Sequence, residues 1–318
     1  MQRIGILRGG VSPEYDISLK TGANVQRALH EAGLEAVDML LDKQGVLHIK
    51  GIPADIEQAK DSVDLVWNAL HGEFGEDGQI QELFEQYDIP YTGSSSDVVK
   101  LAFDKHSAKE SAKSLGIDTP ASLLVIPEGN ESVSEVTGRI YKTMAPPWVL
   151  KPLSGGGSVR TYFAFTPLEL AQFVEESISN NQPFLAEQYI SGREAAVGVI
   201  DGFRGQDPYV LPVMEVTSPS RDILKYDTRA GNEAYARLHG GFSKKERDVL
   251  SDLAKRLHQH FGAKDYSQSE FIVDRRGKPW FIELDTHPHL TNNAPFLQAL
   301  ESVGATLQEF VRSIVDNK

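Results

Sequence analysis

Apolar and polar residues along the first hundred positions are arranged as short strands around one helix. Apolar runs at residues 4–7, 36–41 and 63–70 predict three strands. Residues 18–32 carry apolar side chains at helical spacing and stop at Gly33, which predicts a helix between the first two strands. Strand, glycine-containing turn, helix and strand is the order of a parallel sheet covered by helices.

The pattern changes near residue 97, where apolar side chains recur at helical spacing over a longer stretch. It predicts one long helix over residues 97–115, closed by Gly116. A second helix is expected to begin at Thr166, because Pro167 suits the first turn and Glu169 completes a capping box. Strands are expected between these helices, at residues 122–126 and 148–150.

From about residue 184 the chain has mainly the pattern of strands. We expect strands at residues 184–190, 195–200, 211–216, 269–273 and 280–284, with helices at 244–261 and from 307. Residues 217–238 lack regular spacing and are expected to form a long irregular loop. The whole pattern predicts an α/β protein with domains at residues 1–96, 97–183 and 184–318.

Composition narrows the class of protein. With 318 residues and 40% hydrophobic residues, the chain can bury a core, so disorder is excluded. A net charge of −13 argues against a nucleic acid partner, and the lack of cysteine excludes disulfides and thiolate chemistry. No apolar run approaches the ~18 residues that span a bilayer, and the first residues are too polar for a secretory signal. We expect a soluble cytoplasmic protein that binds no membrane.

Two loops follow predicted strands of the first domain. Residues 8–14 can expose backbone N–H groups to an anion, or Glu14 can hold an ammonium group at the end of the sheet. The loop is not a dinucleotide-binding fingerprint, and the alternative is a tight turn with a solvated Glu14. Residues 71–78 contain three glycines and three acids, and the alternative for them is an ordinary surface loop.

Two further clusters suggest a nucleotide. Lys151 ends a predicted strand, and the glycine- and serine-rich residues 153–159, Ser158 among them, can wrap a triphosphate. This is not a Walker A motif, because the lysine precedes the glycines, and a flexible hairpin is the alternative. The strand edge from Glu187 to Ile190 can contact an adenine and Glu194 a ribose, although an ordinary strand with solvated glutamates explains these residues equally well.

Three carboxylates on a predicted hairpin suggest a metal. Glu283 and Asp285 are two residues apart on one strand and therefore share a face, and Glu270 lies on the neighbouring strand. Converging carboxylates repel one another unless a cation binds them, and oxygen ligands suit Mg²⁺, with Mn²⁺ as an alternative. His287 and His289 offer only weak support for zinc, because they lack the usual ligand spacing.

The order and spacing of these clusters resemble the D-alanine–D-alanine ligases of the ATP-grasp superfamily, over nearly the whole chain. The motifs that carry the resemblance are Gly9-Gly10…Ser12…Glu14…Ser18, His71-Gly72…Gly75-Glu76-Asp77-Gly78, Pro90-Tyr91-Thr92-Gly93-Ser94, Asp104-Lys105, Lys151-Pro152 and Glu283…Asp285-Thr286…Pro288. The resemblance implies an N-terminal parallel-sheet domain and two lobes that grip ATP. It also implies that ATP phosphorylates a carboxylate and that an amine then attacks the acyl phosphate, in cell-wall precursor synthesis.

The resemblance also implies roles for individual residues. Lys105 and Lys151 correspond to the lysines that contact the ATP phosphates, and Glu14 to the acid that holds the amine of the first amino acid. The remaining correspondences are Glu187 and Ile190 for adenine, Glu194 for ribose, Ser158 in the glycine-rich loop, and Glu270, Glu283 and Asp285 for Mg²⁺. D-alanine or a relative is the implied substrate, and a homodimer is the implied assembly.

Several positions depart from the family pattern. Gln268 stands where the family has an arginine at the acyl-phosphate site, Ala294 replaces a serine, and His289 replaces a glycine. The mobile loop lacks its usual Lys-Tyr end, so Arg229 and Lys225 are candidates for a relocated cation. We therefore consider three hypotheses: a D-alanyl dipeptide ligase, a ligase with another amino or hydroxy acid acceptor, and an inactive ATP-grasp protein.

Overall fold

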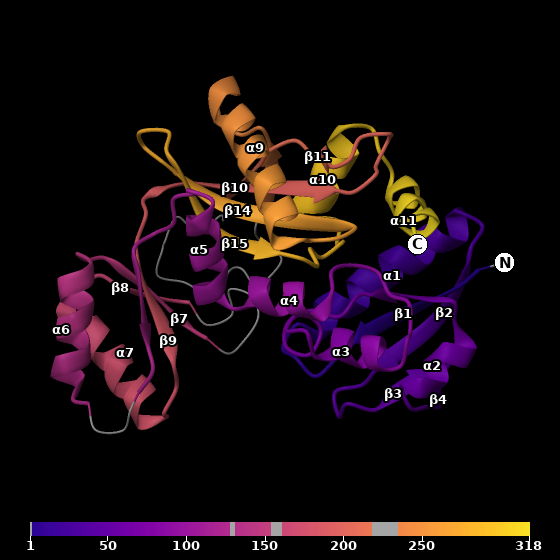
Figure 1. Ribbon diagram of the computed structural model, residues 1–318, viewed down its shortest axis with the longest axis horizontal. Helices are drawn as coiled ribbons and strands as arrows, with labels where there is room; N and C mark the ends of the chain where they lie inside the picture. The colour runs from indigo at the N-terminus through magenta and orange to yellow at the C-terminus, as the bar shows by residue number, and fades with distance from the viewer. Residues whose placement is uncertain (1, 128–130, 154–160, 218–234) are drawn as a thin grey trace.

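A computed structural model describes residues 2–127, 131–153, 161–217 and 235–318. Its three sheets form an N-terminal domain, a central lobe and a C-terminal lobe; in Figure 1 the C-terminal lobe lies at the top, with the central lobe below it on the left and the N-terminal domain below it on the right. Within the described part of the chain, no helix is long and apolar enough to cross a membrane. The predicted α/β class is confirmed.

The N-terminal domain contains the parallel sheet that the sequence predicts. Its strands run in the order β4-β3-β2-β1-β5 and are β1 (Arg3–Gly9), β2 (Glu35–Leu41), β3 (Leu47–Ile49), β4 (Ile52–Pro53) and β5 (Leu65–Asn68). The strands β2, β1 and β5 are parallel, whereas β3 and β4 add an antiparallel edge. Its helices are α1 (Tyr15–Glu31), α2 (Glu57–Ser62) and α3 (Gln79–Gln86). The carboxyl ends of β1 and β5 therefore meet at one edge.

The central lobe is a four-stranded antiparallel sheet backed by two helices. The strands, in the order β6-β9-β7-β8, are β6 (Ser122–Val125), β9 (Phe184–Gln188), β7 (Trp148–Pro152) and β8 (Tyr162–Ala164). Helices α6 (Val133–Thr143) and α7 (Pro167–Ser179) both begin with a complete capping box, and that of α7 is the predicted one. Fully buried Trp148 and Phe184 lie in the core between sheet and helices.

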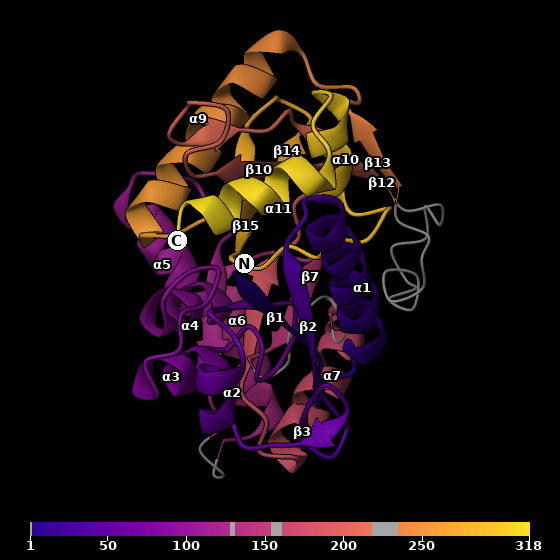
Figure 2. The same ribbon diagram turned by 90° about the vertical axis from the view of Figure 1, so that its right-hand side faces the viewer.

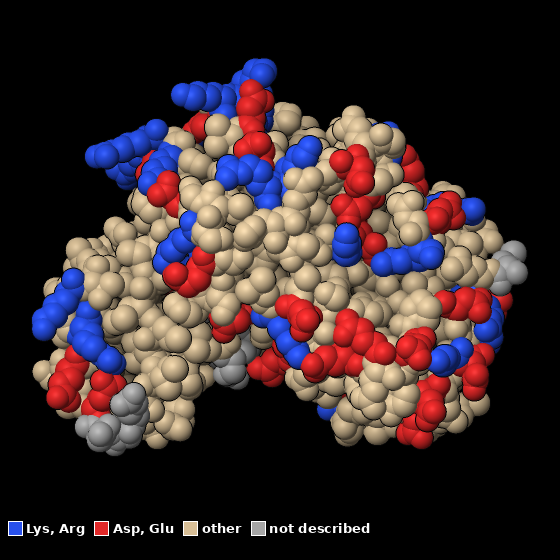
Figure 3. Space-filling view, viewed as in Figure 1, with Lys and Arg blue, Asp and Glu red and all other residues tan. Residues whose placement is uncertain are grey.

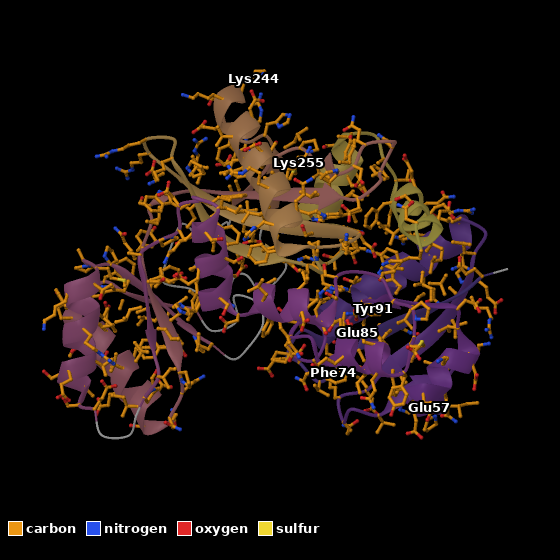
Figure 4. The ribbon with its side chains drawn as sticks, viewed as in Figure 1. Glu57, Phe74, Glu85, Tyr91, Lys244 and Lys255 are labelled. Carbon is orange, nitrogen blue, oxygen red and sulfur yellow. The ribbon has the colours of Figure 1, made fainter. Side chains whose placement is uncertain are left out.

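The C-terminal lobe is built on the sheet β13-β12-β10-β14-β15, with β11 pairing β10. Its strands are β10 (Gly192–Ile200), β11 (Tyr209–Val210), β12 (Met214–Thr217), β13 (Tyr235–Leu238), β14 (Tyr266–Asp274) and β15 (Pro279–Asp285). Helices α9 (Lys244–Phe261), α10 (Pro295–Ser302) and α11 (Leu307–Asp316) complete it. Lys244 and Lys255 are exposed on α9 (Figure 4), in a region where basic and acidic side chains are mixed on the surface (Figure 3).

One core joins the first domain to the C-terminal lobe. Trp67 on β5 stacks on Tyr266 of β14 with ring centroids 6.1 Å apart, and it meets Phe310 of α11 edge-on at the same distance. Helix α11 lies beside α1 in both views (Figures 1 and 2). Because these rings are fully buried, residues of the two units contribute to one continuous hydrophobic cluster.

Three expectations from the sequence need correction. The helix expected at residues 97–115 is two helices, α4 (Ser96–Phe103) and α5 (Lys105–Ser114), because Asp104 is extended and its carboxylate accepts a hydrogen bond from the N–H of Ser107. The loop expected at 217–238 contains β13, which pairs with β12. The boundary expected before residue 184 cuts the central sheet, since β9 pairs with β6 and β7.

A carboxylate in α3 fixes where α4 begins. Glu85 accepts hydrogen bonds from the N–H of Ser96 at 2.9 Å and from its hydroxyl at 2.6 Å. The hydroxyl of Tyr91 donates to the same carboxylate at 2.6 Å (Figure 4). An anion at a helix N-terminus satisfies free N–H groups and favours the helix dipole. This contact orients α4 and, through it, α5 with Lys105 at its first position.

Candidate active site

The two predicted loops of the N-terminal domain meet at one edge of its sheet. The Ser12 hydroxyl donates to the carbonyl of His71 at 2.6 Å and accepts from the N–H of Glu14 at 3.1 Å. Gly72 has a φ of +72°, and a Cβ there would lie 2.9 Å from Oε2 of Glu14. A side chain at residue 72 would therefore disturb Glu14, which places the glutamate carboxylate against the second loop.

The imidazole of His71 is held from two sides. Its Nδ1 lies 2.8 Å from Oε1 of Glu76, and its Nε2 lies 3.1 Å from the hydroxyl of Thr21 on α1. Burial is the main cause that lowers the pKa of His71 to about 4, so the ring is neutral at pH 7. A neutral ring contributes no positive charge to offset ionisation of the carboxyl groups beside it.

Four carboxylates take part in the pKa shifts at this edge: Glu14 and Glu76 of the N-terminal domain, and Glu283 and Asp285 of the C-terminal lobe. Burial, followed by the charge of Glu76, raises the pKa of Glu14 to about 7. Burial and Glu283 raise the pKa of Glu76 to about 8, and burial and Glu76 raise the pKa of Asp285 well above its usual value. The ammonium group of Lys105 opposes the shifts of Glu14 and Glu76. Such a group gains stability from any cation that enters it.

The predicted hairpin brings the candidate metal ligands onto neighbouring strands. Glu270 of β14 pairs in register with Glu283 of β15, and Gln268 pairs with Asp285. Among the described residues, no three His, Asp or Glu side chains lie close enough together to close around a metal ion in this structure. The carboxylates therefore fit a hard cation by charge and by strand register, while their metal role stays a prediction.

Gln268 lies at the open end of this hairpin, opposite Asp285. Its side chain is 5% exposed, its Nε2 lies 3.4 Å from Oε1 of Glu270, and its buried Oε1 has no hydrogen-bond partner. A buried amide with an open acceptor is typical of a position that contacts a ligand or ordered water. Ala294 is 1% exposed at the N-cap of α10, so its side chain offers no hydrogen bond there.

Two histidines follow the hairpin. The N–H of His287 donates to Asp285 at 2.7 Å, while both ring nitrogens of His287 are buried without a partner. Gly93 must remain small, because a Cβ there would lie 2.6 Å from the ring of His287. His289 meets His71 edge-on with ring centroids 6.0 Å apart, and its Nδ1 lies 2.9 Å from the hydroxyl of Thr291. Neither arrangement resembles a zinc site.

The nucleotide-binding candidates lie between the central and C-terminal lobes. The carboxylate of Glu187 on β9 has ion pairs with Lys109 and Lys151, each 2.9 Å long. These two charges hold the pKa of Glu187 at about 2 although the carboxylate is buried. Its Oε1 lies in the ion pair with Lys109, although the angles of that contact fall outside those of a regular hydrogen bond.

Other candidates lie near these residues or outside the described ranges. Ile190 is buried just after β9, and Glu194 is partly exposed on β10, in register with Ile272 of β14. Ser158 and Arg229 lie outside the described residues, as does Lys225. The roles expected for these residues remain predictions.

Two residues at the site had no individual role predicted from the sequence: Glu76, which was named only as part of a motif, and Lys109. Glu76 acts on both Glu14 and Asp285, and Lys109 is a buried ammonium group. Lys109 lies four positions after Lys105, so both are on one face of α5, together with apolar Ala112. That spacing is the one sequence signal that points to Lys109.

Comparison with known proteins places these observations in a family. The profile described as D-ala D-ala ligase C-terminus matches residues 112–316, and the corresponding N-terminus profile matches residues 48–94. A D-alanine–D-alanine ligase of Aquifex aeolicus is 31% identical over 316 residues, covering 98% of this chain and 99% of the relative.

Solved structures share the fold over the same length. D-alanyl-alanine synthetase A from Vibrio cholerae superposes with a TM-score of 0.85 at 22% identity, covering 99% of this chain and 98% of the other. The VanG D-Ala:D-Ser ligase from Enterococcus faecalis gives a TM-score of 0.85 at 20% identity, with the same coverage. Together with the sequence matches, this full-length agreement shows that the chain belongs to the D-alanine–D-alanine ligase family of ATP-dependent ATP-grasp ligases.

Proposed function

We propose that this enzyme joins two small amino acids, D-alanine or a relative as the first, and that its acceptor subsite differs from that of a D-alanine-specific enzyme. The observation that carries the proposal is the contrast between the two halves of the site. Carboxylates that attract an ammonium group and a cation are present, whereas Gln268 and Ala294 offer no charge to an acceptor carboxylate.

The residues predicted to bind the nucleotide have side chains suited to ATP. Lys105 and Lys151 supply ammonium groups suited to phosphate oxygens. Glu187 lies beside the same phosphate-binding candidate, since its carboxylate pairs with Lys151 at 2.9 Å. We therefore assign Lys105 and Lys151 to the phosphates and Glu187, Ile190 and Glu194 to the nucleoside.

The hairpin carboxylates suit a divalent metal. Burial and the neighbouring carboxylates, Glu283 among them, raise the pKa of Asp285, and a hard cation would replace its proton. We assign Mg²⁺ to Glu270, Glu283 and Asp285. When bound, the metal would neutralise charge on the phosphates and keep them aligned.

Glu14 is suited to hold the ammonium group of the first amino acid. Its pKa of about 7 lets an incoming ammonium shift the carboxyl to its ionised form at neutral pH. The carboxylate of that amino acid attacks the γ-phosphorus, and ADP leaves. The amine of the second substrate then attacks the acyl carbon, loses a proton, and releases phosphate.

Gln268 limits how this second step is stabilised. Its amide can donate one hydrogen bond to the acyl phosphate but brings no positive charge, so stabilisation of the developing charge is weaker than with an arginine. Ala294 cannot donate from its side chain to an acceptor carboxylate. An acceptor amino acid whose carboxylate lies farther from this region therefore suits the site better than D-alanine.

The test is a screen for ADP release with Mg²⁺, ATP and individual D- and L-amino acids, followed by the mass of the product. The proposal expects an amide product when D-alanine is offered together with a second amino acid, and little product when D-alanine is offered alone. ADP release without any new amide would contradict it. We also propose a cytoplasmic setting, where ATP is available; the implied homodimer remains a prediction for sedimentation.

A further inference from the structure

Three charged side chains form a chain across the junction of the lobes. Lys109 of α5 contacts Oε1 of Glu187, and Lys151 of β7 contacts Oε2 of the same carboxylate, each at 2.9 Å. The side chains of Lys109 and Glu187 are 0% and 3% exposed, whereas that of Lys151 is 12% exposed. The two lysines thus share one carboxylate but differ in access to solvent.

Lys109 is tied to two strands. Its ammonium group donates to the carbonyl of Ile282 at 2.8 Å, so it is tied to β15 as well as to β9. Ile282 directly precedes Glu283, a predicted metal ligand, and Lys105 lies on the same face of α5. Three elements that carry predicted nucleotide or metal residues therefore converge on one buried ammonium group.

Binding a phosphate creates a competition for Lys151. A phosphate oxygen and the carboxylate of Glu187 both attract its ammonium group, and moving toward the phosphate weakens the pair with Glu187. A buried carboxylate without a compensating cation is strongly unfavourable. Lys109 supplies the compensating cation, because it stays paired with Glu187 when Lys151 moves.

We propose that Lys109 is a positioning residue for ATP: it is the resident counter-ion of Glu187 and so allows Lys151 to turn toward the phosphates. This inference rests on the proposed assignment of Lys151 to the phosphates. Without Lys109, the ammonium group of Lys151 would be held on Glu187. Lys109 itself need not touch the nucleotide.

A double-mutant cycle tests the mechanism. In Lys109→Met, the dissociation constant of a non-hydrolysable ATP analogue, measured by calorimetry, should rise roughly 10- to 100-fold, since one uncompensated buried charge must be tolerated upon binding. In the Glu187→Gln background, where the carboxylate of Glu187 no longer holds Lys151, the same substitution should change the dissociation constant by less than about threefold. Lys113→Met, on an exposed turn of the same helix, is the matched control and should leave affinity unchanged.

Adenosine provides a second readout, because it has no phosphates to recruit Lys151. Lys109→Met should weaken ATP binding far more than adenosine binding. Equal weakening of both ligands, or equal effects in both backgrounds, would show that Lys109 only supports the fold and would overturn the inference. The Lys109→Met/Glu187→Gln protein should unfold at a higher temperature than either single variant, which ensures a folded protein for the comparison.

The two proposals fail in different ways. If Lys151→Ala leaves ATP affinity unchanged in an otherwise native protein, the assignment of Lys151 to the phosphates is wrong. If Lys151→Ala weakens ATP binding but Lys109→Met does not, the assignment stands and the role of Lys109 is refuted.

Discussion

Replacing Glu14 by glutamine should make the ligand-free protein more stable at high pH. The carboxyl is buried beside Glu76, and its pKa rises from 4.5 to about 7. A group whose pKa is higher in the folded state contributes stability below its unfolded pKa, and this contribution is lost as pH rises through the folded value. Ionised Glu14 therefore costs roughly 3 kcal/mol above pH 8, from about 1.4 kcal/mol per pKa unit.

Glutamine keeps the shape of the carboxyl group without the charge. The free energy of unfolding of Glu14→Gln should exceed that of the wild type by roughly 2–3 kcal/mol more at pH 8.5 than at pH 5. His71 shows the opposite dependence, since its pKa is lowered to about 4, but it is present in both proteins and its contribution largely cancels. The same variant should lose activity, because it cannot pair with an ammonium group.

Urea unfolding followed by circular dichroism at both pH values provides the assay. Glu73→Gln removes an exposed glutamate from the loop beside His71 and is the matched control; it should change neither profile. A Glu14→Gln protein that is less stable than the wild type at pH 8.5, or a gain that is equal at both pH values, would refute the reasoning.

Three other changes test separate parts of the site. Lys151→Ala should weaken ATP binding by about 1.5–3 kcal/mol, because a charge-assisted phosphate contact is lost, and unchanged affinity in calorimetry would contradict this. Mg²⁺ with a nucleotide should raise the melting temperature of the wild type but raise that of Glu283→Gln much less; equal increases would locate the metal elsewhere. Asp104→Ala should cost about 1 kcal/mol of unfolding free energy through the lost cap of α5, whereas Asp104→Asn should retain most of it.

Local signals predict much of this fold. The capping box from Ser243 to Glu246 and the left-handed Gly262 define α9 at the predicted bounds, because a helix end depends on its own few residues. The break at Asp104 is not visible in the same way. Apolar spacing continues from α4 into α5, and only the hydrogen bond from Ser107 distinguishes a new N-cap from an aspartate within a helix.

The site is predictable where it follows the sheet and not where distant segments meet. Glu14 and His71 both follow parallel strands, so their proximity follows from the rule that strand ends share an edge. The approach of Asp285 to Glu76 depends on how the lobes pack, with more than 200 residues between them in the chain. The burial of Lys109 also depends on how the lobes pack. It could not be predicted from the sequence, because a lysine in a helix is normally solvated.

The central claim is that this family member forms an amide but uses D-alanine poorly as acceptor. Steady-state kinetics with ATP, Mg²⁺ and D-alanine, read by ADP release and by product mass, tests it most directly. The account predicts a kcat/KM for D-alanine below ~10⁴ M⁻¹s⁻¹, the lower end of ordinary enzymes, with a higher value for another acceptor from the pool. A value at or above that level with D-alanine alone would show that Gln268 and Ala294 are compensated and would contradict the account.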